Sequence, residues 1–105
     1  MAFFLVRYCY TDDTAGRDAH RARHKDYLSE AAERGMILGS GPFAADEEAG
    51  AAMIYRASCK ADVVEVVEGD PFRCRGYVAS YEVTEWIPMI GPWAADAQRR
   101  AATPA

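Results

Sequence analysis

Two histidines, His20 and His24, are the side chains in this sequence best suited to transfer a proton near neutral pH. Residues four apart share one face of a helix, so His20, His24 and Leu28 form a row on the helix predicted here. A helix that buries Leu28 and Ala31 against a sheet brings His24 to the edge of the buried surface, where it can meet a small molecule. A structural histidine at the core edge, satisfied by a hydrogen bond, is the alternative interpretation.

Asp70 is the candidate partner for such a histidine, because it precedes Pro71 at a predicted turn. Its carboxylate either caps the backbone of Phe72 and the next residue or accepts a hydrogen bond from an imidazole, and these roles are compatible. If Asp70 accepts from His24, it sets the tautomer and stabilises the charged ring, which leaves the other ring nitrogen to move a proton. Such a pair supports elimination, isomerisation or simple hydrolysis of a small polar substrate.

The segment formed by Ser40, Gly41 and Pro42 is a candidate contact for an anionic substrate. Gly41 and the backbone amides around Pro42 allow close approach of an anion, and the hydroxyl of Ser40 can donate to it. A plain turn explains the same three residues equally well. Arg21 or Arg23 is expected to help hold an anionic or phenolic substrate. The predicted substrate-binding residues are Ser40, Gly41, Pro42, Arg21, Tyr8 and Phe72.

Neither a cofactor nor a metal site is predicted. The sequence has no glycine-rich dinucleotide fingerprint and no phosphate loop, which argues against hydride transfer. His20 and His24 have the spacing of two metal ligands on a helix, but no HExxH arrangement and no third ligand accompany them. Cys9, Cys59 and Cys74 have no zinc-like spacing, and catalysis by an activated thiol is not expected from them.

The charge balance bears on the partners of the chain. Twelve basic and 16 acidic residues give a net charge of −4, whereas nucleic-acid-binding proteins usually carry a basic patch. An odd cysteine count without paired spacing is typical of free thiols in a reducing compartment, so we expect a cytoplasmic protein. The apolar stretch 1–10 is interrupted by Arg7, is too short for a membrane span and lacks a signal-peptide pattern. We therefore expect a small-molecule ligand and no nucleic acid or membrane as partner.

The hydrophobic pattern predicts elements in the order β-α-β-β-α-β. Residues 2–10 are apolar on both faces, which is typical of an interior strand. Gly35 ends the helix that carries the histidines, and Ser58 is the expected N-cap of the second helix, whose valines form its buried side. The expected strands and helices span residues 2–10, 17–35, 36–41, 51–57, 59–68 and 77–87, with a helical turn at 72–76.

This order predicts a ferredoxin-like α+β fold, in which a four-stranded antiparallel sheet carries both helices on one face. The other face has no helix of this chain to cover it, while Tyr77, Tyr81 and Trp86 add to the aromatic residues of the first strand. An exposed apolar face indicates a partner, so we predict a homodimer formed sheet to sheet. Residues 1–93 are expected to form a single domain, and the alanine-rich tail 94–105 a frayed helix or a disordered segment.

The order and spacing of several short motifs resemble the YciI-like (YCII-related) family of small α+β proteins. The resemblance covers roughly residues 2–90 and rests on the motifs Arg21-Ala22-Arg23-His24, Tyr27-Leu28, Gly35, Ser40-Gly41-Pro42, Asp70-Pro71-Phe72 and Trp86. It implies a dimeric, ferredoxin-like fold related to the α+β barrel and muconolactone-isomerase-like proteins. It also implies the chemistry best supported in the family, which is elimination of chloride from a chlorinated hydroxyquinol by a histidine–aspartate pair.

Carried over by motif, that catalytic pair is His24 and Asp70. The predicted function is therefore a small-molecule enzyme of lyase or isomerase type, acting on a phenolic or lactone-type substrate. A non-catalytic dimer of the same fold that binds a small ligand or regulates is the alternative. The chain departs from the family pattern in its alanine-rich tail, in Cys74 and in the extended strand end at 88–93, and these departures leave the substrate open.

Overall fold

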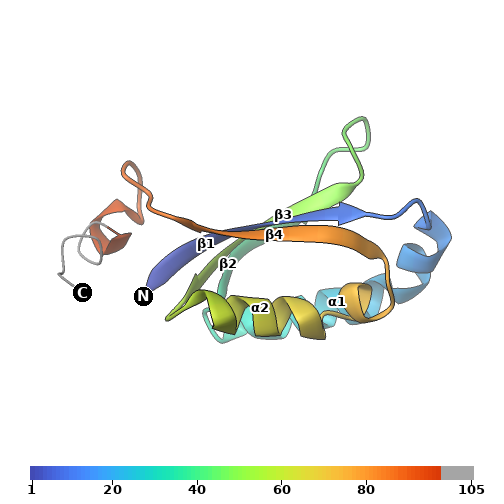
Figure 1. The fold of residues 1–105 in the computed structure, drawn as a ribbon, viewed down its shortest axis with the longest axis horizontal. Coiled ribbons are helices and arrows are strands. Elements are labelled where there is room, and N and C mark those ends of the chain that lie inside the picture. Colours follow the sequence, from blue (N-terminus) through green and yellow to red (C-terminus); the bar gives the residue numbers. More distant parts are fainter. Residues whose placement is uncertain (98–105) are drawn as a thin grey trace.

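The structure, a computed structural model, describes residues 1–97 and confirms the predicted order of elements, including the short helical turn after Asp70. The chain folds into an α+β domain in which every predicted strand and helix is present (Figure 1). The elements are β1 (Ala2–Tyr10), α1 (Thr14–Glu33), β2 (Ile37–Pro42), β3 (Gly50–Ala57), α2 (Lys60–Gly69), α3 (Pro71–Cys74) and β4 (Val78–Trp86).

The four strands form one antiparallel sheet in the order β2-β3-β1-β4, as the ferredoxin-like prediction requires. β1 lies between β3 and β4, which explains why its sequence is apolar on both faces. The helices α1 and α2 cover the same face of the sheet, and the opposite face carries no helix (Figure 1). Within the chain the sheet stays open and does not close into a barrel.

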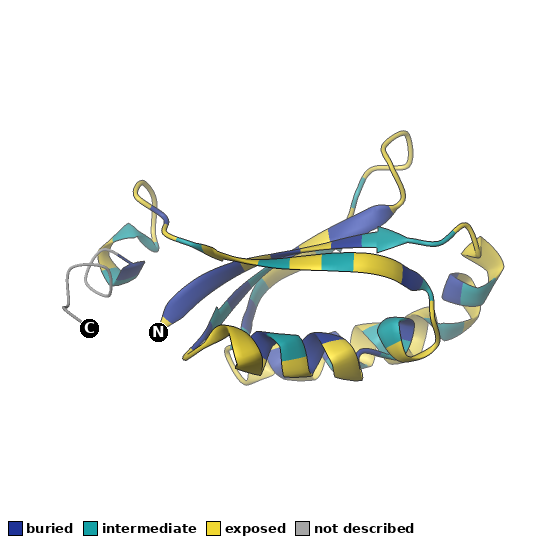
Figure 2. Ribbon diagram, viewed as in Figure 1, coloured by how far each residue is buried: buried dark blue, intermediate teal, exposed yellow. Residues whose placement is uncertain are grey.

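The hydrophobic core lies between the sheet and the two helices (Figure 2). Alternate residues of β1, among them Phe4 and Val6, point into it and are 1% exposed. The predicted valine face of α2 is confirmed, because these side chains are buried at Val63, Val66 and Val67. α1 contributes a narrower apolar stripe, so most of its surface is left to polar side chains.

The two helices start differently from their predictions. α1 begins at Thr14, because the Asp13 side chain accepts a hydrogen bond from the backbone amide of Gly16 at 2.8 Å. α2 begins at Lys60 with Cys59 as its N-cap in an extended conformation and without a side-chain cap bond. The prediction that Ser58 caps this helix is wrong, because Ser58 lies one residue before the N-cap position. At the end of α1, Gly35 adopts the expected positive φ of 82°.

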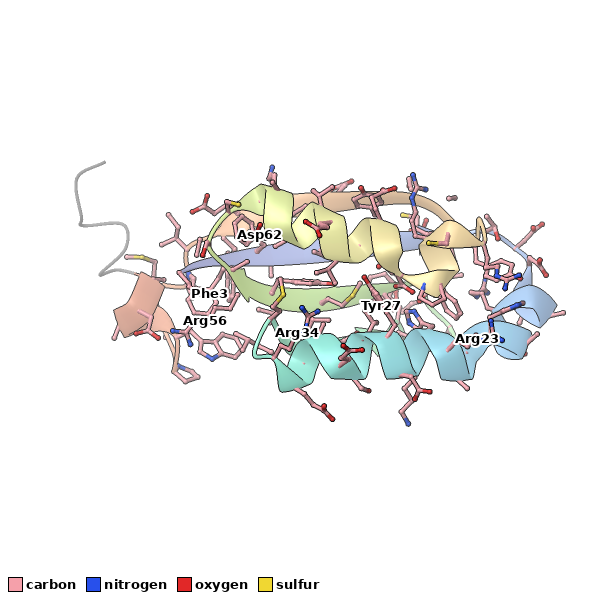
Figure 3. All side chains as sticks on the ribbon, turned by 90° about the horizontal axis from the view of Figure 1, so that it is seen from below. Phe3, Arg23, Tyr27, Arg34, Arg56 and Asp62 are labelled. Carbon is pink, nitrogen blue, oxygen red and sulfur yellow. The ribbon has the colours of Figure 1, made fainter. Side chains whose placement is uncertain are left out.

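Tyr27 connects the two helices across the core (Figure 3). Its hydroxyl donates to the carbonyl oxygen of Val66 in α2 at 2.8 Å. Gly69 gives the ring the space it needs, because a Cβ at this position would collide with the Tyr27 hydroxyl. This bond holds α1 and α2 together at the point where α2 leads into α3.

The face of the sheet without helices is less aromatic than the sequence indicated. Tyr81 pairs with Tyr8 and therefore points toward the helices, and Tyr77 precedes β4. Of the aromatics Tyr77, Tyr81 and Trp86, Trp86 is the one that pairs with Phe3 on the open face. Phe3 on the same face is only 1% exposed, because Trp93 packs against it with ring centroids 5.9 Å apart.

The chain after β4 returns to this end of the open face. Asp96 forms an ion pair with Arg56 at 3.1 Å, and the Arg56 guanidinium lies over the Phe3 ring (Figure 3). Residues 94–97 are helical, and the rest of the predicted tail, 98–105, lies outside the described residues. Across residues 1–97, no helix has both the length and the apolar character needed to span a membrane.

Candidate active site

His24 and Asp70 meet at the junction of α1 and α3. The His24 Nδ1 atom lies 2.7 Å from the Asp70 Oδ1 atom, although 46 positions separate the residues in the chain. The Asp70 side chain is fully buried, whereas the His24 side chain keeps 14% of its surface exposed. One side of the imidazole therefore contacts a buried carboxylate, while part of the ring is exposed at the protein surface.

The Asp70 carboxylate accepts hydrogen bonds from two further donors. The backbone amide of Phe72 donates to Oδ1 at 3.0 Å, which confirms the predicted capping role, and the Tyr8 hydroxyl donates to Oδ2 at 2.8 Å. A buried carboxylate needs such partners, because burying it without them is strongly unfavourable. A carboxylate only accepts, so the proton on this side of the His24 ring lies on Nδ1, and Nε2 is left as the basic nitrogen.

Tyr8 remains a hydrogen-bond donor throughout the physiological pH range. Burial raises the pKa of the Tyr8 phenol far above its ordinary value, and the negative charge of Asp70 raises it further. The Tyr8 hydroxyl therefore keeps its proton and its hydrogen bond to Oδ2 of Asp70. This bond orients the carboxylate independently of His24.

The His24 ring is held in place by Phe72. The two rings are stacked, with centroids 3.9 Å apart and an interplanar angle of 6°. Among residues 1–97, Nε2 has no hydrogen-bond partner, and it is not one of the buried polar atoms that lack one. Nε2 is therefore open to solvent, in a fixed orientation and without a competing acceptor or donor.

An open cleft of about 500 Å³ lies between α1 and β2, with His24 in its wall. Because β2 runs back along α1, His24 and Arg21 lie at the same end as Tyr10 and Pro42, and the more apolar end lies near Ile37. The cleft is lined by Tyr10, Arg21, His24, Lys25, Leu28, Ser29, Ala32, Ile37, Leu38, Gly39, Ser40, Gly41, Pro42, Ala51 and Met53. Its volume suits a small molecule.

Four of the predicted substrate-binding residues line this cleft, namely Arg21, Ser40, Gly41 and Pro42. The last three lie inside the edge strand β2 and pair with β3, so the plain-turn interpretation of this segment is wrong. The Arg21 guanidinium is also within 2.6 Å of the Asp18 carboxylate on the same helix. The chain thus brings these residues to the wall that carries His24.

Tyr8 and Phe72, which we expected to contact the substrate, lie behind His24 instead. Both are fully buried and neither lines the cleft. Tyr8 contacts Asp70 and Phe72 contacts the imidazole, so they support the pair. Asp70 explains why both residues are buried. Its buried carboxylate requires hydrogen-bond donors inside the core, and the Tyr8 hydroxyl and the Phe72 backbone amide are these donors.

Three polar residues of the cleft were not predicted as site residues, namely Tyr10, Lys25 and Ser29. Lys25 and Ser29 follow Arg21 at intervals of four, so the helical row could have indicated them. Tyr10 shares its strand face with Tyr8 and lies two residues closer to the end of β1. The alternation of side chains along β1 predicts the face on which Tyr8 and Tyr10 lie. It does not predict that the core ends at Tyr8 and that the cleft begins at Tyr10.

The other histidine has different surroundings. The His20 Nδ1 atom lies 3.0 Å from the Gly16 carbonyl oxygen and 3.1 Å from the Tyr77 hydroxyl oxygen. Residues 1–97 contain no group of three or more histidine, cysteine or acidic side chains arranged to hold a metal. All three cysteines are free thiols.

Comparisons with known proteins identify a family and a similar solved structure. The family model described as the YCII-related domain matches residues 1–87. Among solved structures, the chain resembles the 5-chloro-2-hydroxyhydroquinone dehydrochlorinase (TftG) of Burkholderia phenoliruptrix, solved in complex with 2,5-dihydroxybenzoquinone. The identity is 26%, the match covers 80% of this chain and 92% of that chain, and the TM-score is 0.68. The comparison with curated proteins finds no significant match.

Proposed function

This chain belongs to the YCII-related domain family, and we propose that it is a small-molecule enzyme of lyase or isomerase type. In this proposal His24 is the general acid–base and Asp70 orients it. The observation that carries the proposal is the 2.7 Å contact between the buried Asp70 carboxylate and His24, whose opposite nitrogen is open to a cleft. The similarity to a dehydrochlorinase supports the same class of reaction.

The proposed chemical step is a proton transfer to Nε2 of His24. In an elimination, Nε2 takes a proton from the substrate, the electron pair of the broken bond forms a new double bond, and the leaving group departs with its own pair. The ring then carries a positive charge, which the Asp70 carboxylate stabilises through Nδ1. No oxidant or reductant is needed, because the substrate loses a proton and an anion together.

The cleft supports a phenolic or lactone-type substrate of small size. Arg21 and Lys25 supply positive charge along α1 for an ionised or polarised oxygen. Ser40 can donate a hydrogen bond from the β2 side, where Gly41 leaves the backbone accessible to a ligand. The apolar residues between these walls would contact a flat ring.

Turnover of a chlorinated phenol tests the proposal. The wild-type protein is incubated with 5-chloro-2-hydroxyhydroquinone and related chlorinated phenols and lactones, and chloride release is measured. Replacing His24 by alanine is expected to reduce the rate by about a hundredfold or more, because general acid–base groups contribute that much. A H24A protein that turns over substrate like the wild type would contradict the proposal. A variant that unfolds would indicate that the histidine is structural.

We also propose that two copies associate through the open face of the sheet. Leu5 on this face is 39% exposed, and beyond β4 the apolar side chains of Ile87 and Ile90 are 48% and 95% exposed. Exposed apolar residues of this size favour a partner surface. Sedimentation at micromolar concentration is expected to give the mass of two chains, and a species of one chain's mass would exclude the dimer.

A cytoplasmic location completes the proposal. Its support is the free state of Cys9, Cys59 and Cys74, since unpaired thiols persist where the compartment is reducing. Fractionation of cells that express the tagged chain tests the location.

A further inference from the structure

Tyr10 lines the same cleft as His24, and its hydroxyl is available to a ligand. Within residues 1–97 this hydroxyl makes no hydrogen bond, and it is not among the buried polar atoms that lack a partner. It therefore reaches the open space of the cleft. Tyr8 lies on the same face of β1, but its hydroxyl is committed to Asp70. The Tyr10 hydroxyl and the Nε2 atom of His24 are thus two polar groups at one cleft that have no hydrogen-bond partner among residues 1–97.

The Tyr10 ring is held firmly by its neighbours. It packs edge-on against Phe72, with ring centroids 5.7 Å apart, and Phe72 in turn stacks on His24. The Arg17 guanidinium lies over the Tyr10 ring, 4.7 Å from its centroid. The pairing of β1 with β4 shifts register between Cys9 and Tyr10, where β4 contains the extra residue Ala79, so Tyr10 keeps the same face of β1 as Tyr8. One buried ring, Phe72, therefore positions both groups.

The charges around the cleft favour an oxygen that gains negative charge. The lining includes the cationic side chains of Arg21 and Lys25 and no carboxylate. Burial raises the pKa of the Tyr10 phenol, and the Asp70 charge raises it further, against smaller lowering effects of Arg17 and Arg21. At neutral pH the Tyr10 hydroxyl therefore keeps its proton and can donate it in a hydrogen bond.

We propose that Tyr10 is a catalytic residue that donates a hydrogen bond to a ketone, enolate or phenolate oxygen of the substrate. This inference rests on the proposed function, in which Nε2 of His24 removes a proton from the same molecule. As the proton leaves, electron density moves onto the substrate oxygen, and the Tyr10 hydroxyl stabilises it without giving up its own proton. The substrate class is thus narrowed to rings that carry an oxygen within reach of Tyr10 while a proton faces His24.

Binding of 2,5-dihydroxybenzoquinone, measured by titration calorimetry at neutral pH, tests this role separately from turnover. The variant is Tyr10→Phe, which keeps the ring and removes a hydroxyl that makes no hydrogen bond to residues 1–97. Its affinity is expected to be about tenfold or more below that of the wild type, because a hydrogen bond to a charged oxygen contributes that much. The matched control is Tyr81→Phe, whose hydroxyl donates to Glu68 away from the cleft and whose affinity should match the wild type.

The outcomes separate the two proposals. If Y10F binds the quinone as well as the wild type does, or if neither protein binds it, the role of Tyr10 is wrong. A Y10F protein that does not fold would show a structural hydroxyl and would also overturn the inference. With 5-chloro-2-hydroxyhydroquinone, Y10F should lower kcat more than it changes KM. If H24A retains turnover, the proposed function fails, whatever Y10F does.

Discussion

His20 and His24 lie one turn apart on α1, yet they belong to two very different regions. His24 is stacked on a buried ring and contacts a fully buried carboxylate that has two other donors. His20 contacts the carbonyl oxygen of Gly16 on its own helix and the hydroxyl of Tyr77, both neutral groups. The same residue type at equivalent helical positions thus has a charged, enclosed partner in one region and neutral, half-exposed partners in the other.

The difference shows that the partner, and not the histidine, makes a site suitable for proton transfer. A buried carboxylate can stabilise an imidazolium during a reaction, because little water screens the interaction. A backbone carbonyl and a phenol orient a ring, but they offer no charge to it. We call the His24, Asp70, Tyr8 and Phe72 side chains the Asp70 cluster and the His20 and Tyr77 side chains the His20 pair.

Replacing Asp70 by asparagine tests the difference between the Asp70 cluster and the His20 pair most directly, because it removes the charge of the side chain and keeps its shape. The amide oxygen can still accept from Nδ1 of His24 and from the Phe72 backbone, so the ring keeps its orientation. We expect kcat for 5-chloro-2-hydroxyhydroquinone to fall by about a hundredfold or more and up to about 10⁴-fold, as for an aspartate that orients a general-base histidine. The rate of chloride release measures this, with quinone affinity as the readout that should change little.

The matched control is Asp26→Asn, because Asp26 is exposed on α1. Its kcat should equal that of the wild type. If D70N turns over at the wild-type rate, the carboxylate charge is dispensable and the two histidine regions are chemically equivalent.

Removing one tyrosine hydroxyl at a time compares the stability of the two regions. Tyr8→Phe leaves a buried oxygen of Asp70 without its donor and should cost about 1.5–3 kcal/mol of unfolding free energy. Tyr77→Phe removes a half-exposed contact to His20 and should cost about 1 kcal/mol or less. Urea denaturation measures both.

Tyr55→Phe is the internal control for Tyr8→Phe. Tyr55 is equally buried, but its hydroxyl has no hydrogen-bond partner among the described residues, so its removal should be neutral or stabilising. Equal losses in Y8F and Y55F would show that the bond to Asp70 adds nothing.

Alkaline pH should destabilise the protein through its buried phenols. The pKa of Tyr8 is raised above its ordinary value of 10.0, so above that pH the unfolded chain loses a proton that the folded chain keeps. Stability contributed by this group is therefore complete below pH 10 and falls as the pH rises, by up to about 1.4 kcal/mol per pH unit. Urea midpoints between about pH 9 and about pH 11 should fall less steeply in Y8F than in the wild type. Parallel slopes would exclude Tyr8 as the cause.

His20→Ala should have the smallest effect on catalysis. The ring lines no part of the cleft and contacts no charged group, so chloride release should stay within about twofold of the wild-type rate. A loss comparable to that of H24A would mean that the His20 pair takes part in the reaction. The comparison between the two regions would then have to be abandoned.

Much of the fold could be predicted because local patterns and topology agree. The apolar residues on both faces of β1 indicated an interior strand, and the valines of α2 indicated its buried side. Asp70 before Pro71 indicated a helix cap, and the carboxylate does accept from Phe72. These signals depend on neighbours in the sequence, so the sequence contains them fully.

Other features depended on how elements pack and were predicted less well. Ser58 was expected to cap α2, but the N-cap is Cys59 and the helix begins one residue later than predicted, at Lys60. The aromatic residues of β4 and β1 were expected to exceed what one face of the sheet can bury, and the register with β1 places Tyr81 on the face that the helices cover. Tyr8 was expected in the cleft, and the demand of Asp70 for an enclosed donor places it in the core, so that Tyr10 occupies the cleft instead.

The sequence by itself determined the order of elements, the α+β class and the family, and it proposed His24 and Asp70 as a pair. It did so because periodicity, capping and motif spacing are properties of short segments. The tertiary structure decided that His24 rather than His20 meets Asp70, and which side chains enclose that contact. Contacts across 46 positions arise from packing two helices on one sheet, and no local pattern encodes the distance between them.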